Sequence, residues 1–430
     1  MWINFKYSLF IAGIFADLWS SLGAAPTRVK KKWKFETLSA IQMTVTQSKV
    51  IEESTNPENS IYQLPVTKIS TELRPEFKVK YGRNSRLVIR PRFVYDQSHR
   101  EAASLEHKRD EGQGRAYINE AYGVMAFGQK WQSTVGLQNF QWGPAEIASP
   151  SNPLFRDLGL DKPYAFETRG KSLLRVNYSP EPGLSLIAIG EVADNSEEKP
   201  KFEASFRRKA LLKTELADAS QTDYVGLVLV GTQLERPEVG VYAHWEVLAG
   251  LTSYFDGTLR YGSTAYYPVL DELDAGFRQN RLQSHAPLST AVIGLRYVTE
   301  GNWDFRLEGV RDEGGWTPED RKTARILLAA DLNAKNLALF LQPGTILPGQ
   351  RFVYGSLRVP NLWPQNSVTA TVRSIYSLAD RTYRDLLTFD SYIGDHFVVS
   401  LGGSSNAGPL NGELTQGYRW SSFLYGSWIW

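Results

Sequence analysis

The chain has 430 residues, a formal net charge of +2 and no cysteine, and 42% of its residues are hydrophobic. The missing cysteines exclude a disulfide-stapled secreted scaffold and a cysteine-ligated zinc or iron–sulfur protein. The near-neutral charge excludes the strongly basic surface of a nucleic-acid-binding domain, so no nucleic acid is expected as a partner. A bundle of membrane-spanning helices would need repeated apolar runs of about 18 residues, and only the extreme N-terminus comes close.

Residues 1–25 are predicted to be a signal peptide. Lys6 precedes a short apolar stretch over residues 7–16, and small residues follow up to Ala25, where a signal peptidase could cut. Asp17 interrupts the apolar run, which leaves an uncleaved anchor or a buried N-terminal helix as the alternative. Export without cysteine and without a further spanning helix indicates a Gram-negative periplasm or outer membrane.

From about residue 33 to the C-terminus, apolar and polar residues alternate. The alternation is clearest where polar residues separate Trp303, Phe305 and Leu307, and the same rule holds near 201–209, 290–297 and 368–376. Successive side chains of a strand point to opposite faces, so each segment is predicted to be a strand with one apolar and one polar face. Segments of around ten residues suit a tilted strand that crosses a membrane.

The links between these segments alternate between short and long. Short links lie near 82–85, 128–130, 179–183 and 299–301, and long ones near 48–65, 97–112, 143–169, 267–287 and 403–417. This pattern predicts an all-β fold, a transmembrane antiparallel β-barrel of about 18 strands (16–20) with short periplasmic turns and longer outer loops. Residues 26–430 are expected to form this single domain. The candidate strands at 336–342 and 351–359 are its weakest members.

The chain ends on an aromatic strand over residues 420–430, which includes Trp428 and Trp430. A soluble β-sandwich would also alternate, but loose termini of soluble chains are normally polar. This ending resembles the C-terminal recognition strand of Gram-negative outer-membrane proteins, which implies that the barrel-assembly machinery reads it as an assembly signal. Aromatic residues also gather near other segment ends, as in the interfacial girdles of a barrel surrounded by outer-membrane lipid.

The polar face of the strands is expected to line the lumen. Candidates for the pore lining or the solute path are Lys78, Lys80, Arg90, Arg92, Glu120, Arg175, Arg207, Arg296, Arg306 and Arg373. The same parity also places Lys201, Lys209, Arg325, Glu191, Glu203, Glu246, Asp304, Glu308 and Asp331 inward. Basic residues outnumber acidic ones, and rings of Arg or Lys favour anions, so a weak anion preference is predicted. The alternative is that these charges pair across neighbouring strands and stiffen the wall.

Residues 143–169 are predicted to fold into the lumen as a constriction loop. A barrel of 16 to 18 strands encloses an aqueous channel unless something folds in. This stretch does not alternate, is moderately apolar and is stiffened by prolines, which suits a loop anchored against the wall. The candidate constriction residues are Pro144, Pro150, Asn152, Pro153 and Phe155. An ordinary surface loop is the alternative.

A family resemblance rests on this region. Residues 136–143 (GLQNFQWG), followed by Ser149-Pro150-Ser151-Asn152-Pro153, resemble a motif of Gram-negative porin-like and alginate-export-like outer-membrane barrels. The stretch 117–123 (YINEAYG), which contains Glu120, resembles the strand that precedes the motif, and the likeness covers about 115–180. It implies a channel for small hydrophilic solutes or a secretion pore for an acidic polysaccharide.

Enzyme chemistry is not predicted. The five histidines, His99, His107, His244, His285 and His396, lack a neighbouring nucleophile motif. Asp271, Glu272 and Asp274 could bind Ca²⁺ through oxygen atoms, but solvated loop charges explain them more simply. No cofactor and no metal are therefore expected.

The function that the sequence predicts is an outer-membrane channel, porin-like, for diffusion of small hydrophilic solutes, anionic ones included. An export or surface-assembly barrel for an acidic polysaccharide is the first alternative. A plugged structural or adhesive barrel is the second. The sequence is compatible with a homo-oligomer.

Overall fold

The computed structural model describes residues 33–430 except 52–55, 60–62, 83, 102–108, 156–166, 194–205, 234, 264, 271–274, 280–286, 332–333, 342, 364–367, 410–411 and 416. The predicted signal peptide lies outside the described residues. The same holds for Lys201, Glu203 and the candidate calcium ligands at 271–274.

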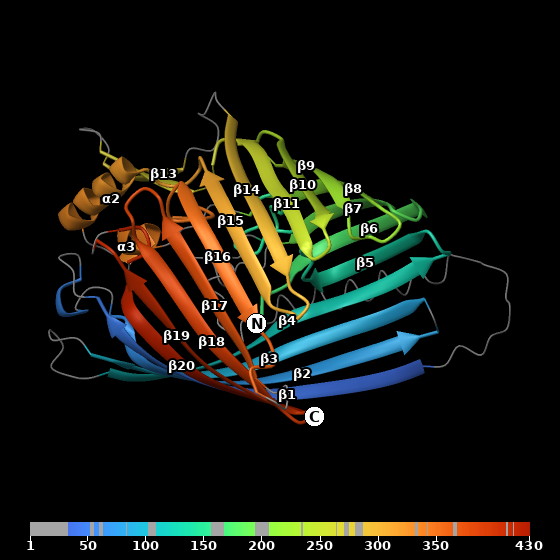
Figure 1. Cartoon of the computed structure of the whole chain (residues 1–430), viewed down its shortest axis with the longest axis horizontal. Coiled ribbons are helices and arrows are strands. Elements are labelled where there is room, and N and C mark those ends of the chain that lie inside the picture. Colours follow the sequence, from blue (N-terminus) through green and yellow to red (C-terminus); the bar gives the residue numbers. More distant parts are fainter. Residues whose placement is uncertain are drawn as a thin grey trace.

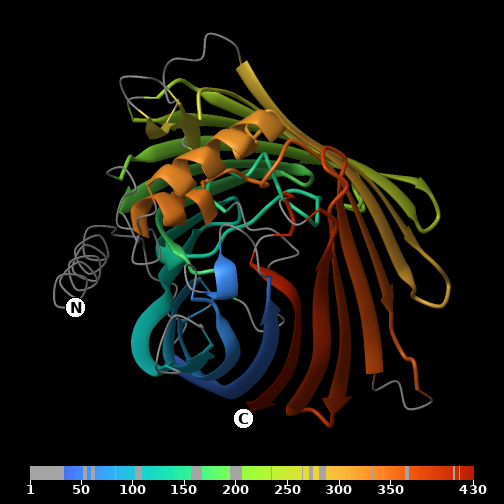
Figure 2. The ribbon, with the colours of Figure 1, turned by 90° about the vertical axis from the view of Figure 1, so that its left-hand side faces the viewer.

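Eighteen strands form one antiparallel sheet that closes on itself, because β1 pairs with both β2 and β20 (Figures 1 and 2). The predicted fold class is confirmed, with the strand number that alternation indicated. The strands are β1 (Trp33–Val50), β2 (Pro65–Tyr81), β3 (Ser85–Arg100), β4 (Arg109–Phe127), β5 (Trp131–Gln138), β6 (Lys171–Glu181), β7 (Leu184–Ala193), β8 (Lys209–Ala217), β9 (Tyr224–Thr232), β10 (Glu238–Leu248), β11 (Leu251–Tyr261), β14 (Pro287–Val298), β15 (Asp304–Asp312), β16 (Arg351–Val359), β17 (Val368–Ser377), β18 (Tyr383–Ile393), β19 (Phe397–Ala407) and β20 (Tyr418–Ile429).

Side-chain burial follows the predicted alternation. In β15, Phe305 and Leu307 are exposed on the outer wall, whereas Arg306, Glu308 and Val310 point inward. Large apolar side chains dominate the exposed positions of the wall. This is the arrangement of a barrel whose outer face meets hydrocarbon, since only every second residue needs to be apolar. Closure also pairs the backbone polar groups that lipid cannot satisfy.

Aromatic side chains gather at the end of the barrel that carries the short links. The start of β1 and the end of β20 lie at the same end. The rings of Trp33 and Tyr81 lie 4.5 Å apart, those of Trp131 and Tyr178 lie 4.2 Å apart, and the C-terminal pair Trp428–Trp430 is at 5.6 Å. Each pair flanks a short turn or a terminus. Their common level agrees with a periplasmic aromatic girdle.

The segment between β15 and β16 departs from the prediction. Residues 336–341, expected as part of a weak strand, belong to the helix α3 (Ala334–Leu341), whereas the expected strand at 351–359 is β16. A second helix, α2 (Pro318–Ala330), precedes α3 and contains Arg325, with Asp331 as its C-cap. Placing Arg325 and Asp331 on a strand that lines the lumen was therefore wrong. Thr317 and Asp320 form a capping box that starts α2, a helix signal that strand parity does not register.

The two helices and a small hairpin form a cap over the end of the barrel with the long loops. The hairpin consists of β12 (Tyr266–Val269) and β13 (Gly276–Gln279). Trp316 is buried between the hairpin and the helices, and its indole N–H donates to the carbonyl of Tyr266 at 2.9 Å. In Figure 2 both helices lie in front of the barrel interior. Within the described part of the chain, no helix is long and apolar enough to cross a membrane.

Other boundaries also differ from the prediction. Both ends of the expected loop at 97–112 are strand, because β3 continues to Arg100 and β4 begins at Arg109. The expected strand at 201–209 has no strand structure at 206–208, and β8 begins only at Lys209. Strand ends beyond the membrane can be polar on both faces, so alternation does not mark where they stop.

Candidate pore constriction

The segment after β5 turns into the barrel instead of passing over its rim. Ile147 and Ala148 are buried against inward-facing residues of β14–β18, and Leu154 and Phe155 are buried against those of β6–β10. The loop therefore packs against two groups of wall strands that are separated from each other only by β11. Four of the predicted constriction residues are buried: Pro150, Asn152, Pro153 and Phe155. The fifth, Pro144, is half-buried at the start of the loop.

Two buried carboxylates hold the loop by its backbone. Glu308 on β15 accepts hydrogen bonds from the N–H groups of Glu146 at 2.7 Å and Ile147 at 3.0 Å. Asp256 on β11 accepts from the N–H of Ser151 at 2.8 Å. Both acids are 0% exposed, and a buried carboxyl oxygen is costly to leave without a hydrogen-bond partner. We call Glu308 and Asp256 the loop latches. Sequence analysis placed Glu308 inward but missed Asp256, although its parity on β11 could have revealed it.

The glycine of the W-G motif fits tightly against the Asp256 latch. Gly143 has a φ of +98°, and a Cβ there would lie 2.0 Å from the Ser149 hydroxyl oxygen and 2.1 Å from Asp256 Oδ2. That hydroxyl is itself 2.6 Å from Asp256 Oδ2. Only a residue without a side chain leaves this contact intact. The glycine of the motif is therefore required both by the close approach of Ser149 and Asp256 and by the positive φ of Gly143.

A Gly143→Ala substitution should release this end of the loop. We expect a larger and noisier single-channel conductance. We also expect the free energy of unfolding to fall by more than the roughly 1–2 kcal/mol that a residue with a side chain costs in a left-handed conformation. Gly128→Ala is the matched control, since Gly128 also has a positive φ (+66°) but open space around the added Cβ. Equal conductance in the two variants would show that the contact at Gly143 does not hold the loop.

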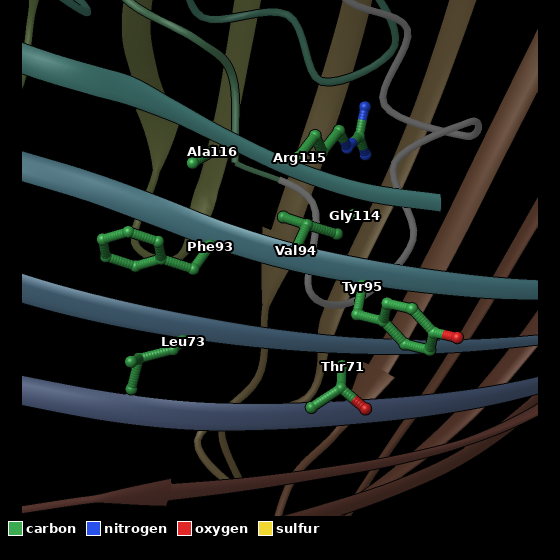
Figure 3. Close-up of a pocket in the computed structure, with 8 residues that line it drawn as sticks. All are labelled: Thr71, Leu73, Phe93, Val94, Tyr95, Gly114, Arg115 and Ala116. Atoms are coloured by element: carbon green, nitrogen blue, oxygen red, sulfur yellow. The ribbon is translucent and has the colours of Figure 1, made fainter. Parts of the chain in front are cut away.

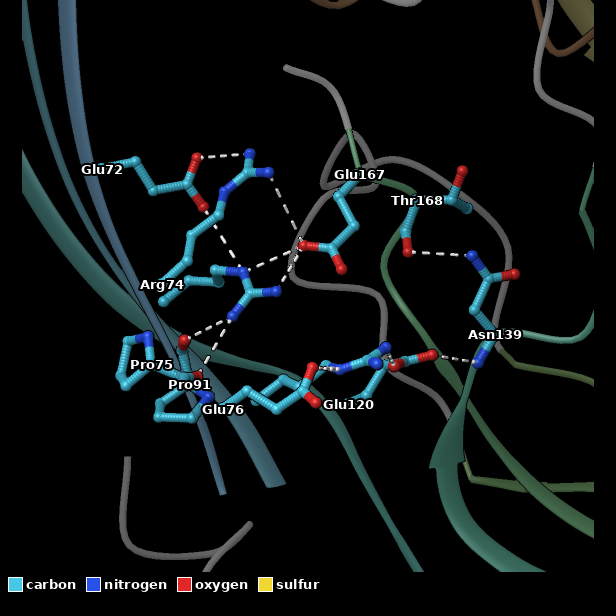
Figure 4. Close-up of polar contacts among 11 residues, drawn as sticks. Glu72, Arg74, Pro75, Glu76, Pro91, Glu120, Asn139, Glu167 and Thr168 are labelled. Carbon is cyan, nitrogen blue, oxygen red and sulfur yellow. Dashed lines mark hydrogen bonds and ion pairs between the residues drawn. The ribbon is translucent and has the colours of Figure 1, made fainter. Parts of the chain in front are cut away.

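A second network ties down the base of the loop (Figure 4). Glu120 accepts a hydrogen bond from the backbone N–H of Asn139 at 2.9 Å and forms an ion pair with Arg90. Arg92 donates through Nε to Glu167 at 3.0 Å, where the loop returns to the wall. Arg90, Arg92 and Glu120, which were predicted to line the pore, are thus brought together at the loop base.

Most of the other predicted lumen cations contact carboxylates. Arg296 pairs with Asp304 at 2.8 Å, and Lys80 pairs with Glu36 at 2.9 Å. Lys78 pairs with Glu76, Arg207 with Glu235 at 3.3 Å from a position just before β8, and Arg306 and Arg373 with Glu146. This is the pairing that the sequence left open as the alternative. The acidic partners at 36, 76, 146 and 235 were not anticipated.

Arg175 has a different setting. Its guanidinium lies 4.0 Å from the centroid of the Phe140 ring and donates to the Thr134 hydroxyl at 3.3 Å. A cation over an aromatic face is stabilised without losing its charge. Arg86 is level with it on the wall, because β3, β4, β5 and β6 pair Arg86, Val124, Thr134 and Arg175 in one row. This row places two arginines on the lumen side below the loop.

A third inward segment joins the cap to the lumen. Ile346 and Leu347 are buried in the same apolar cluster as Ile147. Beside them Arg321 of α2 lies 3.5 Å from Glu413 and donates to the carbonyl of Pro348 at 2.8 Å. Burial raises the pKa of Glu413 and lowers the pKa of Arg321. Sequence analysis did not predict this contact, because it expected strands where α2 and α3 lie.

A hollow of about 470 Å³ on β2–β4 lies away from the loop (Figure 3). Leu73, Phe93 and Tyr95 line it, and all three are exposed at outward-facing positions. The hollow therefore belongs to the apolar outer wall and not to the path through the lumen. Among the described residues, no group of three or more His, Asp or Glu side chains is placed to hold a metal ion.

Comparison with known proteins gives matches only at the level of structure. No family model matches the sequence, and no curated protein matches it. Among solved structures, Pseudomonas aeruginosa OccK11 (OpdR) aligns with a TM-score of 0.54 at 9% identity, over 92% of this chain and 95% of that one. OccK1 (OpdK) gives 0.53 at 12% identity over 92% and 98%, and OccK2 (OpdF) gives 0.52 at 12% over 93% and 97%. The chain has a porin-like fold. The predicted resemblance is thereby confirmed for the architecture of this porin-like barrel.

Proposed function

We propose that this chain is an outer-membrane channel through which small hydrophilic solutes diffuse, with a preference for anions. The observation that carries the proposal is a closed barrel whose lumen is narrowed by a latched loop, with Arg306 and Arg373 at the place where the loop meets the wall. Charged side chains at a narrow section decide which ions pass. The apolar outer wall and the aromatic girdle support the outer-membrane location.

The chemistry of the structural neighbours supports the same solute class. One OpdK structure, described as that of an outer membrane protein, has the same fold as this chain, with a TM-score of 0.51 at 11% identity. OpdK has been solved with vanillate, and OccK2 with glucuronate. Both ligands are small carboxylates. In this chain the buried loop segments around Ile147 and Ile346 fill part of the lumen, which favours small solutes over a polysaccharide chain.

Conductance and swelling measurements test the proposal. In planar bilayers with asymmetric KCl, the refolded chain should form open channels. Their reversal potential should lie between zero and the equilibrium potential of chloride. In liposomes, glucuronate should enter faster than glucose. A silent bilayer would support the plugged structural barrel, and a clearly cation-selective reversal potential would contradict the anion preference. Uptake of acidic sugars alone, with no neutral sugar entering, would favour the export barrel.

A further inference from the structure

Glu146 lies in the first part of the constriction loop, against β15, β16 and β17. Its carboxylate is 3.3 Å from Nε of Arg306 and 3.4 Å from Nε of Arg373. It also accepts a hydrogen bond from the Ser356 hydroxyl at 3.1 Å. One carboxylate of the loop is therefore surrounded by two cations and a hydroxyl donor from the wall.

The wall side of this contact is built by strand register. Arg306 pairs with Ser356 across β15 and β16, and Ser356 pairs with Arg373 across β16 and β17. Residues directly opposite each other on neighbouring strands point to the same face. The three donors therefore form one inward-facing row whose spacing is fixed by the sheet. A row of this kind exists whether or not Glu146 occupies it.

The side chain of Glu146 is not what holds the loop in place. Its backbone N–H and that of Ile147 are held by Glu308, and Ile147 is buried in the wall. The side chains of Glu146, Arg306 and Arg373 keep 22%, 23% and 30% of their surface exposed, so the contact can be reached from solvent. The Glu146 carboxylate can therefore leave these donors and be replaced by another carboxylate from solvent.

We propose that Arg306, Ser356 and Arg373 form a carboxylate subsite of the pore, that Glu146 fills this subsite when no solute does, and that a solute carboxylate takes its place during passage. This inference rests on the proposed channel function and names the group by which a solute is held. Arginine binds carboxylates well through its planar array of donors. Exchange of one carboxylate for another keeps both arginines compensated, and competition from Glu146 keeps solute binding weak enough for release.

Replacing Glu146 with glutamine tests the subsite. Glu146→Gln keeps the size of the side chain and the backbone bonds to Glu308 but removes the Glu146 carboxylate from both arginines, of which Arg306 still has Asp304 at 3.5 Å. We expect the reversal potential in asymmetric KCl to move closer to the equilibrium potential of chloride. The glucuronate concentration that halves the KCl current should fall about tenfold, as a gain of about 1.4 kcal/mol in affinity would produce. Glu300→Gln, the same change at an exposed periplasmic turn, should leave both values unchanged.

The outcomes separate this inference from the function on which it rests. A wild-type chain that folds but does not conduct overturns the proposed function. A conducting wild type with a Glu146→Gln variant identical to it in reversal potential and glucuronate block overturns the subsite alone. Folding of each variant is checked by the heat-dependent shift in electrophoretic mobility. Arg373→Gln provides a second, opposite test, because loss of one cation should weaken glucuronate block while a glucose control stays unaffected; an unchanged block would also overturn the subsite.

Discussion

Replacing Glu308 with glutamine should widen the pore and make its current unsteady. The Glu308 carboxylate is fully buried and accepts from two loop N–H groups and from the Tyr254 hydroxyl at 2.7 Å. A glutamine offers one acceptor oxygen and turns an NH₂ donor toward the other loop N–H. A buried donor left without a partner costs about 1–3 kcal/mol, so the loop should leave its position for part of the time.

Single-channel recording in symmetric KCl measures this effect. We expect Glu308→Gln to add a second, larger conductance level with frequent transitions, and the double variant with Asp256→Asn to occupy that level most of the time. Glu181→Gln, at an exposed turn, serves as the control for the change of charge. A variant that keeps the wild-type conductance in a single level would show that the latch does not set the pore size.

Deleting residues 145–162 gives the upper limit of the same effect. The deletion removes the latched backbone together with the apolar anchors Ile147, Leu154 and Phe155, whereas Glu308→Gln removes none of these anchors. Conductance should therefore rise in the order wild type, Glu308→Gln, deletion. A deletion variant that conducts like the wild type would place the narrowest section elsewhere, for instance at the cap.

The barrel could be predicted from the sequence because its signal is local. One face of each strand must be apolar and the other wet, so alternation such as that of Phe305 and Leu307 with Arg306 and Glu308 appears within a few residues. The helices α2 and α3 escaped the same reasoning. Their apolar residues follow a helical period, and the decisive signal was the capping box at Thr317 and Asp320.

The constriction was harder to predict, because its contacts join distant parts of the chain. Parity indicated that Arg306 and Arg373 face the lumen, but not that the register of three strands aligns them with Ser356. Ser356 and the loop residue Glu146 are 210 positions apart in the sequence. Such pairings depend on barrel closure and loop placement, which no periodicity encodes. Parity could therefore list many of the lumen charges but could not say which of them are paired.

Replacing Trp430 with alanine should reduce the amount of assembled barrel in cells while leaving the refolded barrel nearly as stable as the wild type. The backbone of Trp430 closes the sheet, since its N–H donates to the Ser39 carbonyl at 2.9 Å and its carbonyl accepts from the Ser39 N–H at 3.0 Å. The side chain plays no part in those bonds and is 53% exposed. We therefore expect its loss to change the free energy of unfolding by no more than about 1 kcal/mol.

Two measurements on one variant separate recognition from stability. The amount of heat-modifiable barrel in the outer-membrane fraction reports assembly, and urea unfolding after refolding in lipid vesicles reports stability. Trp420→Ala is the matched control, because Trp420 is a 39% exposed tryptophan at the opposite end of the same strand. If the assembly machinery reads the C-terminal residue, only Trp430→Ala should lose several-fold in assembly. Equal losses in both variants, or a parallel loss of stability, would mean that the terminal tryptophan acts as one more member of the aromatic girdle.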